Sequence, residues 1–157
     1  MSAGYLIERF SDATRLEALH RFVQDAFRDL AIDPPSSALK ETLAHFAARL
    51  QSDTIFVASD AGQLIGSIFC TPGRDALYIG RLAVRPDWRR RGIAGTLVDA
   101  AKAEAKRRGA KRITLGARIA LPGNVALFRR RGFAIVRETC HRGFMTPTSY
   151  DMELLLA

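Results

Sequence analysis

A basic, glycine-containing turn stands between Arg85 and Gly95, directly before a long helical pattern. It reads RPDWRRRGIAG and places three consecutive arginines ahead of Gly92. A helix N terminus presents unpaired backbone N–H groups and the positive end of its dipole, and glycine lets a ligand approach the backbone closely. Arginines add positive charge where a pyrophosphate would lie. The turn therefore predicts an anion-binding site. A solvated basic turn is the alternative, because glycine-rich turns before helices are common.

A strand and a helix are predicted to hold this turn in place. Residues 77–84 (LYIGRLAV) are apolar, aromatic or β-branched, and Pro86 prevents the strand from continuing. After the turn, apolar residues recur at helical spacing from Ile93 to Ala105, and Gly109 is placed to end the helix. The stretch 78–109 thus predicts a strand, a turn and a long helix.

This stretch resembles the acyl-CoA signature of the GNAT superfamily of N-acetyltransferases. The matching residues are Leu82-Ala83-Val84-x-Pro86, followed by Arg89-x-x-Gly92-x-Ala94 and the long helix. In that family the loop amides hold the CoA pyrophosphate, and the exposed edge of the strand pairs with the pantetheine arm. The resemblance covers most of the chain from about residue 52 onward. It implies acetyl-CoA as the acyl donor and no metal.

A second resemblance lies at residues 124–133 (NVALFRRRGF), which match an Asn-led helix followed by aromatic-x-x-x-Gly-Phe. In the family this helix flanks the CoA thiol. Asn124 is suited to cap the helix, to contact the cofactor, or both. Together the two motifs imply a cofactor-binding set from the strand end, the turn and the two helix starts: Leu82, Ala83, Val84, Arg89, Arg90, Arg91, Gly92, Ile93, Ala94, Gly95, Thr96, Asn124 and Phe128.

The sequence departs from the family at both positions that usually move protons. Where a tyrosine often protonates the leaving thiolate, this chain has Phe128, and the central strand offers no glutamate as general base. Tyr78 is the candidate catalytic residue on that strand, because a phenol can donate and accept a proton; a packed strand aromatic is the alternative. A strong base is not essential, since a neutral amine attacks the thioester once both reactants are held in line. The backbone N–H of Val84 is the family's usual oxyanion donor.

Composition sets wider bounds. The 157 residues fit a single domain, 1–157, and the net charge of +8 indicates an anionic ligand such as CoA phosphates, nucleic acid or a membrane surface. Cys70 and Cys140 show neither metal-ligand spacing nor a disulfide framework, which favours a reducing cytoplasm. We find neither a secretory signal nor an apolar run of transmembrane length, so the expectation is a cytoplasmic protein without a membrane partner.

The order of predicted elements is strand, two helices, three strands, helix, strand, helix and two strands. Successive hairpins indicate antiparallel pairing in the first half, and the strand–helix–strand unit at 78–116 indicates one parallel pair. The expected fold class is α/β: a GNAT-like, mixed, mostly antiparallel sheet of six to seven strands with about four helices. Ser36 or Ser37 is expected to cap the second helix, with Leu43 on its inner face and Glu41 outside.

The leading functional hypothesis is an N-acetyltransferase that moves an acetyl group from acetyl-CoA to a primary amine by direct attack in a ternary complex. The acceptor is a small-molecule or peptide amine, in a pocket shaped by the first two helices and the loop around Phe144. The alternatives are an acyl-CoA-binding regulatory domain without catalysis, suggested by Phe128, and a basic nucleic-acid-binding module. Nothing resembles a known nucleic-acid-binding motif, so no such partner is expected. Family members are often dimers, and a homodimer is compatible with the resemblance.

Overall fold

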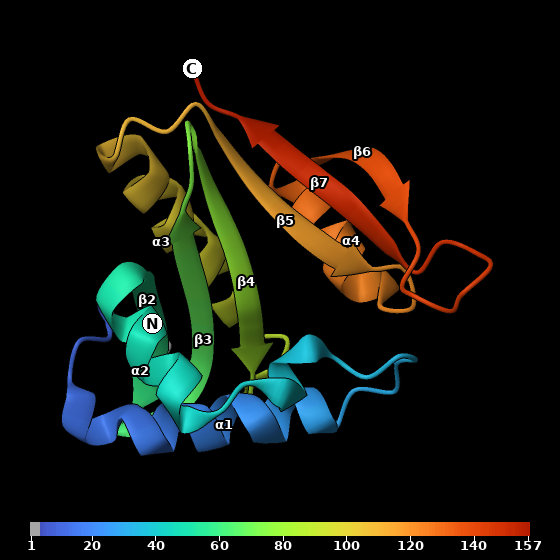
Figure 1. The fold of residues 1–157 in the computed structure, drawn as a ribbon. Coiled ribbons are helices and arrows are strands. Elements are labelled where there is room, and N and C mark those ends of the chain that lie inside the picture. Colours follow the sequence, from blue (N-terminus) through green and yellow to red (C-terminus); the bar gives the residue numbers. More distant parts are fainter. Residues whose placement is uncertain (1–3) are drawn as a thin grey trace.

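The computed structural model describes residues 4–157 of the chain. Within them lie seven strands and four α-helices (Figure 1). In chain order the elements are β1 (Leu6–Arg9), α1 (Leu16–Arg28), α2 (Leu43–Ser52), β2 (Thr54–Asp60), β3 (Gln63–Pro72), β4 (Ala76–Val84), α3 (Ile93–Arg107), β5 (Arg112–Arg118), α4 (Pro122–Arg130), β6 (Ala134–Thr139) and β7 (Ser149–Leu155). The predicted fold class and element order are confirmed.

All seven strands form one sheet in the order β1-β2-β3-β4-β5-β7-β6. Each neighbouring pair is antiparallel except β4 and β5, which are parallel. That parallel pair follows from the crossover through α3, because a strand–helix–strand unit returns the chain in the same direction. The mixed, mostly antiparallel sheet is the one expected from the sequence.

The β4–β5 pair is short, and its two strands then separate. Pairing covers only residues 76–78 of β4 and 112–114 of β5, and beyond Tyr78 the strands diverge (Figure 1). On its other side β4 stays paired with β3, although the register shifts between Ser67 and Phe69. Arg81 lies in the bulge, where Arg81 and Leu82 of β4 stand opposite the single residue Ile68 of β3, and it has a positive φ of 52°. The edge of β4 beyond Tyr78 therefore faces a gap rather than a neighbouring strand.

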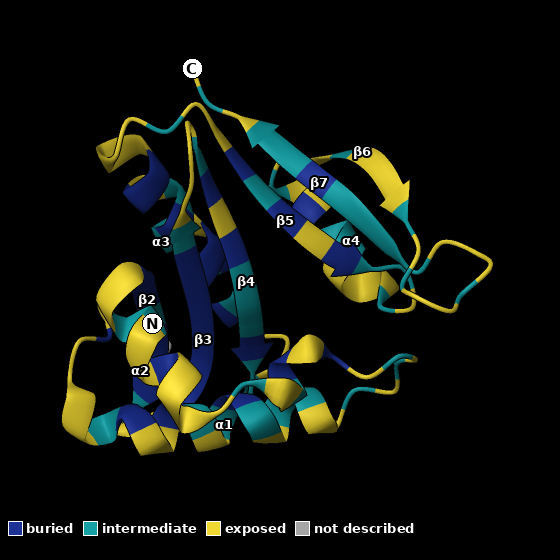
Figure 2. Cartoon of the chain, viewed as in Figure 1, coloured by how far each residue is buried: buried dark blue, intermediate teal, exposed yellow. Residues whose placement is uncertain are grey.

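Helices cover both faces of the sheet, with α1 and α2 on one face and α3 on the other (Figure 1). Two buried clusters correspond to these faces, and the dark β3 between them is buried along most of its length (Figure 2). Helix α3 approaches β3 closely at Gly66, where an added Cβ would lie 3.1 Å from Leu97 and 3.2 Å from Ile93. The lack of a side chain at Gly66 thus lets α3 pack closely against β3. The basic turn lies at the N terminus of this helix.

The second helical region differs from the expectation. Ser36 caps only a 3₁₀ turn, Ser37–Lys40, and α2 begins after a separate cap at Thr42, whose side chain accepts from the His45 N–H. Glu41 lies between the two segments in extended backbone and points inward, because its carboxylate binds Arg49 and Arg81. Leu43 is consequently 41% exposed rather than part of an inner face.

Helix α4 also begins earlier than the sequence suggested. It starts at Pro122, which suits a first helical turn because proline has no N–H to leave unpaired. Asn124 therefore lies inside the first turn, and no side chain caps this helix. The capping role considered for Asn124 is wrong, and its amide is left for another use. Among residues 4–157, no helix combines the length and apolarity needed to cross a membrane.

Candidate active site

A cleft of about 750 Å³ opens where β4 and β5 separate. It runs from the N-terminal ends of α3 and α4 on one face of the sheet to α1 and the loop before α2 on the other. All the predicted site residues line it except Arg91 and Thr96. The residues that it brings together are Tyr78, Leu82, Ala83, Val84, Arg89, Arg90, Gly92, Ile93, Ala94, Gly95, Asn124 and Phe128.

The N terminus of α3 meets the cleft with its backbone amides. Gly92 is the N-cap residue, with φ 79°, and no side chain caps the helix. The first hydrogen bond at this end joins the Thr96 N–H to the Gly92 carbonyl at 3.0 Å. The amides of the three preceding residues, Ile93 to Gly95, have no carbonyl four residues back within the helix. They are available to an anion, which the helix dipole also favours.

Gly92 fits this use in two ways. Its positive φ is a conformation that residues with a side chain rarely adopt. A Cβ added at this position would meet nothing within 4 Å, so the space beside it is open. Arg90 also has a positive φ, 62°, and such alternation of backbone conformation makes a concave set of N–H groups. A pyrophosphate could therefore approach the backbone here directly.

Gly95 has a different role from the one expected. The Arg131 side chain, from the end of α4, occupies the place that a Cβ at Gly95 would take. Arg131 Nε lies 3.3 Å from Asp99 Oδ1, and the Arg131 carbonyl accepts from Lys102 Nζ at 2.9 Å. Gly95 thus lets α4 dock against α3, and of the two glycines only Gly92 has open space beside its Cα.

Arg91 and Thr96 support the turn instead of lining the cleft. The Arg91 guanidinium lies 4.5 Å from the centre of the Trp88 ring, a cation–π contact. The Thr96 hydroxyl donates to the Gly92 carbonyl at 2.9 Å. Both contacts are made within the turn, so these two residues shape it. Of the three arginines in the turn, Arg89 and Arg90 line the cleft, and both are exposed.

The edge of β4 supplies main-chain groups to the cleft. The Arg85 N–H donates to the Ile65 carbonyl on β3 at 2.8 Å. Neighbouring residues of an antiparallel pair alternate in direction, so the N–H and C=O of Val84 point away from β3 and toward the gap. Arg89 Nε donates weakly to that carbonyl, at 3.4 Å. An extended ligand rich in amides could pair with this edge as an added strand.

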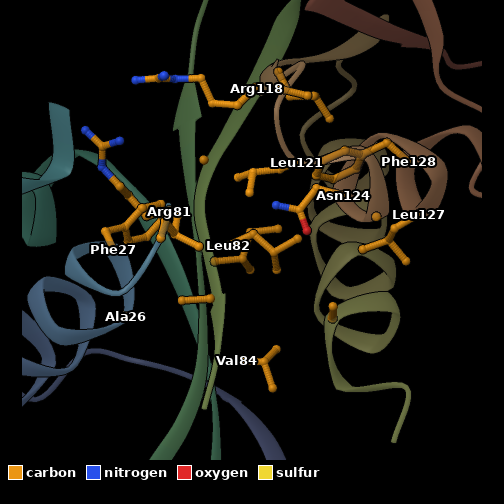
Figure 3. Close-up of a pocket in the computed structure, with 18 of the residues that line it drawn as sticks. Ala26, Phe27, Arg81, Leu82, Val84, Arg118, Leu121, Asn124, Leu127 and Phe128 are labelled. Atoms are coloured by element: carbon orange, nitrogen blue, oxygen red, sulfur yellow. The ribbon is translucent and has the colours of Figure 1, made fainter. Parts of the chain in front are cut away.

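The opposite wall comes from α4 (Figure 3). Phe128 is buried and packs edge-on against Phe133, with ring centroids 5.8 Å apart. It gives the cleft an apolar surface and has no proton to donate, as its type implies. Asn124 projects from α4 toward Leu82 across the gap (Figure 3). Its amide is therefore placed to hydrogen-bond a ligand lying between α4 and β4.

Tyr78 lies at the point where the strands begin to part. A Cβ on Gly116 of β5 would be 3.6 Å from its hydroxyl, and one on Gly80 would be 3.4 Å from its ring. These two glycines leave room for the ring to lie across the opening. Tyr78 is 47% exposed, so the packed-aromatic alternative does not hold. Its phenol faces the cleft, on the side of the sheet that bears α1 and α2.

Two arginines at the far end of the cleft, Arg81 and Arg118, were not predicted as site residues. The two side chains extend to the same side of the strands, away from Phe128 and Leu127 (Figure 3). Arg118, the last residue of β5, donates through Nη2 to the carbonyls of Pro34 at 2.6 Å and Pro35 at 3.3 Å. Burial lowers the pKa of Arg118, although Asp33 acts against this shift.

Arg81 belongs to a network of charges. Its Nε donates to Glu41 Oε1 at 2.7 Å, and Arg49 Nη1 donates to Glu41 Oε2 at 3.0 Å. Arg49 Nε also donates to Asp53 Oδ2 at 2.8 Å. Burial alone would raise the pKa of Glu41, but its bonds to Arg81 and Arg49 outweigh burial and lower it. The network holds Arg81 at the cleft with its charge balanced.

The last loop contributes His141 and Ser149, and Phe144 does not line the cleft. His141 Nδ1 forms a short hydrogen bond with the Thr148 hydroxyl. Burial and the nearby charge of Arg118 lower the pKa of His141. The expectation that this loop shapes the pocket is therefore right for its ends and wrong for its tip, which turns away.

One signal in the sequence does point to these two arginines. Ligands bind in the crevice outside the carboxyl ends of parallel strands. Arg81 lies in the carboxyl-terminal half of β4, and Arg118 ends β5, the other strand of the parallel pair. A charged residue near the carboxyl end of either predicted strand is therefore a candidate for the site.

The cleft has the chemistry that an acyl-CoA needs. One end offers free amides and arginines suited to phosphates, and the middle offers a strand edge and an apolar wall for an extended thiol arm. Its far end, with Tyr78 and two arginines, can receive a second molecule. The open space at Gly92 is the observation that makes the phosphate end fit.

Comparison with known proteins supports this interpretation. A family model described as Acetyltransferase (GNAT) family matches residues 16–133. The N-alpha-acetyltransferase MAK3 of Arabidopsis thaliana is 32% identical over 104 residues, which cover 64% of this chain and 55% of that protein. The chain thus spans about half the length of this relative.

Two solved structures share the fold. The PaiA N-acetyltransferase of Thermoplasma acidophilum, in complex with coenzyme A, has a TM-score of 0.82 at 17% identity and covers 99% of this chain and 100% of its own. The ribosomal-protein-S18-alanine N-acetyltransferase of Escherichia coli has a TM-score of 0.76 at 21% identity, covering 96% of this chain and 93% of its own. At such identities the likeness shows the architecture alone.

Proposed function

The chain belongs to the acetyltransferase (GNAT) family of acyltransferase enzymes, and we propose that it transfers an acetyl group from acetyl-CoA to a primary amine by direct attack in a ternary complex. The observation that carries this proposal is the continuous cleft through the divided sheet. It joins the α3 amides and the β4 edge on one side to Tyr78 and an open pocket on the other. Two reactants could therefore meet between β4 and β5.

Main-chain groups would hold the donor. The amides of Ile93 to Gly95, with Arg89 and Arg90 beside them, would bind the pyrophosphate. The free edge of β4 would pair with the pantetheine arm, and Phe128 would pack against its apolar part. Acetyl-CoA supplies a thioester, whose carbonyl is open to attack by an amine. The Val84 N–H, which points into the gap, would donate to the oxyanion that forms on that carbonyl.

The reaction forms a C–N bond, breaks the C–S bond and moves one proton. The attacking amine loses a proton as the amide forms, and the leaving thiolate gains one. Tyr78 is the residue we assign to this transfer, since its phenol lies at the opening and can both accept and donate. Phe128 cannot take part. Most of the rate enhancement would come from holding the amine and the thioester in line.

Two further features bear on the biological setting. Cys70 is buried and Cys140 is exposed, and both are free thiols, which supports a reducing, cytoplasmic location. Two of the similar proteins are named for acetylating N-terminal or alanine amines. Their names support an α-amine as the acceptor group.

Release of free thiol, followed with a panel of primary amines and checked by mass spectrometry of the acetylated product, tests the proposal. Tyr78→Phe should lower kcat by about 10–100-fold, the size of a general acid–base contribution. Its KM for acetyl-CoA should stay unchanged, because the phenol does not touch the phosphate end. Tyr150→Phe on β7, outside the cleft, is the matched control and should keep full activity. A protein that binds acetyl-CoA but releases no thiol with any amine would instead be a regulatory domain.

A further inference from the structure

We propose that the acceptor carries a carboxylate as well as its amine, and that Arg118, assisted by Arg81, binds this carboxylate. The inference rests on the proposed function and names the class of substrate for the same cleft. Free amino acids and peptides with an acidic N-terminal residue share the required chemistry.

The charges that line the cleft have a single sign. Its charged residues are Arg81, Arg89, Arg90, Arg118 and Arg130, with His141 as a further basic group. No aspartate or glutamate among residues 4–157 lines it. Arg89, Arg90 and Arg130 belong to the end that suits phosphates. Arg81 and Arg118 lie on the opposite face of the sheet, where a second molecule would enter (Figure 3).

Arg118 forms no ion pair within residues 4–157, although the charge of Asp33 acts on it from beyond ion-pair distance. Its Nη2 bonds two neutral carbonyls, and no carboxylate of the described chain lies within 4 Å of its guanidinium. Its Nε and Nη1 donate no hydrogen bond within residues 4–157. A partly buried guanidinium with free donors matches a carboxylate, which can accept two parallel bonds from it. The direction of the Arg118 pKa agrees, because burial lowers this pKa more than the charge of Asp33 raises it.

Arg81 plays a lesser part because Glu41 already balances it. Its Nε and Nη2 are taken by Glu41 and Ser37, and Nη1 donates to nothing within the described residues. It can therefore offer one more hydrogen bond but little net charge. Arg118 supplies the charge and Arg81 an added donor from the other strand.

The arrangement also explains what would be rejected. A polyamine needs carboxylates for its second and third ammonium groups. The carboxylates near this end are Asp33, whose charge acts on Arg118, and Glu41, both of whose oxygens are bound to Arg49 and Arg81; neither lines the cleft. Like charges brought together in a site cost several kcal/mol. A multiply charged cation would therefore be repelled from the end where Arg118 lies.

The positions of Tyr78 and Arg118 suit an amine and a carboxylate in one small molecule. The Tyr78 hydroxyl lies over Gly116, and Arg118 is two residues farther along the same strand. Residues i and i+2 of a strand share a face and are roughly 7 Å apart. An acceptor whose two groups are separated by a few bonds can thus present its amine near Tyr78 and its carboxylate to Arg118.

The experiment compares each carboxylate substrate with its own carboxamide. Thiol release is measured with free amino acids and their amides, with C-terminally amidated peptides that begin with Asp or Glu and their Asn or Gln counterparts, and with spermidine. The two carboxylate arms distinguish the free amino acid from the acidic N terminus as the source. Wild type should prefer one carboxylate arm over its amide by about 10-fold or more in kcat/KM, the range of a charge-assisted bond.

Arg118→Gln is the test variant and Arg112→Gln its matched control. Arg112 begins the same strand, on the same face but outside the cleft. Arg118→Gln should raise KM for the carboxylate substrate about 10–100-fold and change turnover of the amide less than about threefold. Arg112→Gln should do neither. Arg118→Lys, which keeps the charge but loses the fork of donors, should recover part of the loss.

The outcomes separate the two claims. Equal use of acids and amides by wild type, or good use of spermidine, would overturn the carboxylate assignment and leave the acetyltransferase proposal intact. The carboxylate assignment would also be overturned if Arg118→Gln lost the same amount of activity with the carboxylate substrate as with its amide, while its melting temperature and acetyl-CoA affinity stayed unchanged. A wild-type protein that binds acetyl-CoA and acetylates no amine would overturn the proposed function, and this inference with it.

Discussion

The two ends of the cleft are built in opposite ways. The end proposed for the donor is formed largely by one stretch of chain, residues 82–95, through backbone amides and a strand edge, with α4 as the opposite wall. The end proposed for the acceptor is formed by side chains tied across long separations, such as Arg118 to Pro34, 84 positions apart, and Arg81 to Glu41, 40 apart. Binding by backbone groups at the donor end depends little on which side chains are present. Binding at the acceptor end depends entirely on the identity of its side chains.

This contrast explains how a family can keep one donor and change acceptors. Amides at a helix N terminus are present whatever the side chains are, provided that the turn keeps its shape. A guanidinium held by a distant loop, such as that of Arg118, can be removed by a single substitution. The selectivity for the acceptor then changes, and the donor site is kept. Substitutions at one end should therefore leave the other end unaffected. The expected effects range from loss of acetyl-CoA binding to a change of a few fold in acetyl-CoA affinity.

Gly92→Glu should abolish acetyl-CoA binding at the donor end of the cleft. A glutamate at this position would have to adopt the positive φ of Gly92, which residues with a side chain rarely do. Its carboxylate would also lie beside the negatively charged pyrophosphate, and like charges brought together cost several kcal/mol. We expect acetyl-CoA affinity, measured by titration calorimetry, to fall by about 100-fold or more. Gly109→Glu is the matched control, since it lies after the other end of α3 with φ 69° and open space around it. If Gly92→Glu bound acetyl-CoA as well as Gly109→Glu does, the backbone account of this end would fail.

Glu104→Gln should destabilise the packing of α3 against the sheet without changing the cleft. Glu104 is buried and accepts from Arg107, Arg108 and the Thr54 hydroxyl. The bond from Arg107 is the largest cause that lowers the pKa of Glu104 to about 2, from an ordinary value of 4.5. We expect a loss of about 2–3 kcal/mol in the free energy of unfolding near pH 7. The folded variant should bind acetyl-CoA normally.

The same residue gives a pH dependence of defined sign. Because the folded-state pKa of Glu104 is depressed, its contribution is fully present above about pH 4.5 and is lost as the pH falls toward about 2. Denaturant melts of wild type and Glu104→Gln should therefore differ most near neutral pH and converge in acid. A difference that stayed constant from pH 7 to pH 2 would show that Glu104 acts through packing rather than through its charge.

Glu41→Gln should disturb the acceptor end alone. It removes the carboxylate shared by Arg81 and Arg49, so Arg81 loses its charged partner and Arg49 keeps only Asp53. We expect a loss of about 1–2 kcal/mol in unfolding free energy, the scale of a hydrogen bond to a charged group. KM for the amine should rise while acetyl-CoA affinity stays unchanged. A matching fall in acetyl-CoA affinity would mean that the two ends are not independent.

Arg90→Gln should produce the smallest change. Arg90 is exposed at the rim of the donor end, and exposed charges are strongly screened. Acetyl-CoA affinity should fall only about two- to fivefold, and the difference should shrink at high salt. Arg21→Gln, on the outer side of α1, is the control and should have no effect. A loss as large as that of Gly92→Glu would contradict the dominance of the backbone.

The same contrast decides what could be predicted from the sequence. Most residues that line the end proposed for the donor were named from the sequence, because a strand, a turn and a helix start follow one another and each has a local signature. At the end proposed for the acceptor, Tyr78 was named but Arg81 and Arg118 were not, because the residues of this end come from separate elements. Arg118 follows an ordinary strand pattern, and only the fold brings it to Pro34.

The local errors have the same origin. Gly95 resembles a point of ligand approach until Arg131, from another helix, is seen to fill its space. Glu41 has the sequence pattern of a solvent-facing helical residue, yet its carboxylate binds two arginines and it lies in extended backbone between two helical segments. In each case a long-range contact overrode a pattern that was sound at short range.

Thermal melting with acetyl-CoA, beside adenosine bisphosphate and plain phosphate, tests the central claim most directly. If the α3 amides and the β4 edge form the donor site, acetyl-CoA at ~100 times its dissociation constant should add about 2.7 kcal/mol to the stability. For a chain of this size, the melting temperature would rise by roughly 5–10 °C. Phosphate at the same concentration should shift it far less. The absence of a shift at millimolar acetyl-CoA would contradict the account, because the donor end would then bind no donor.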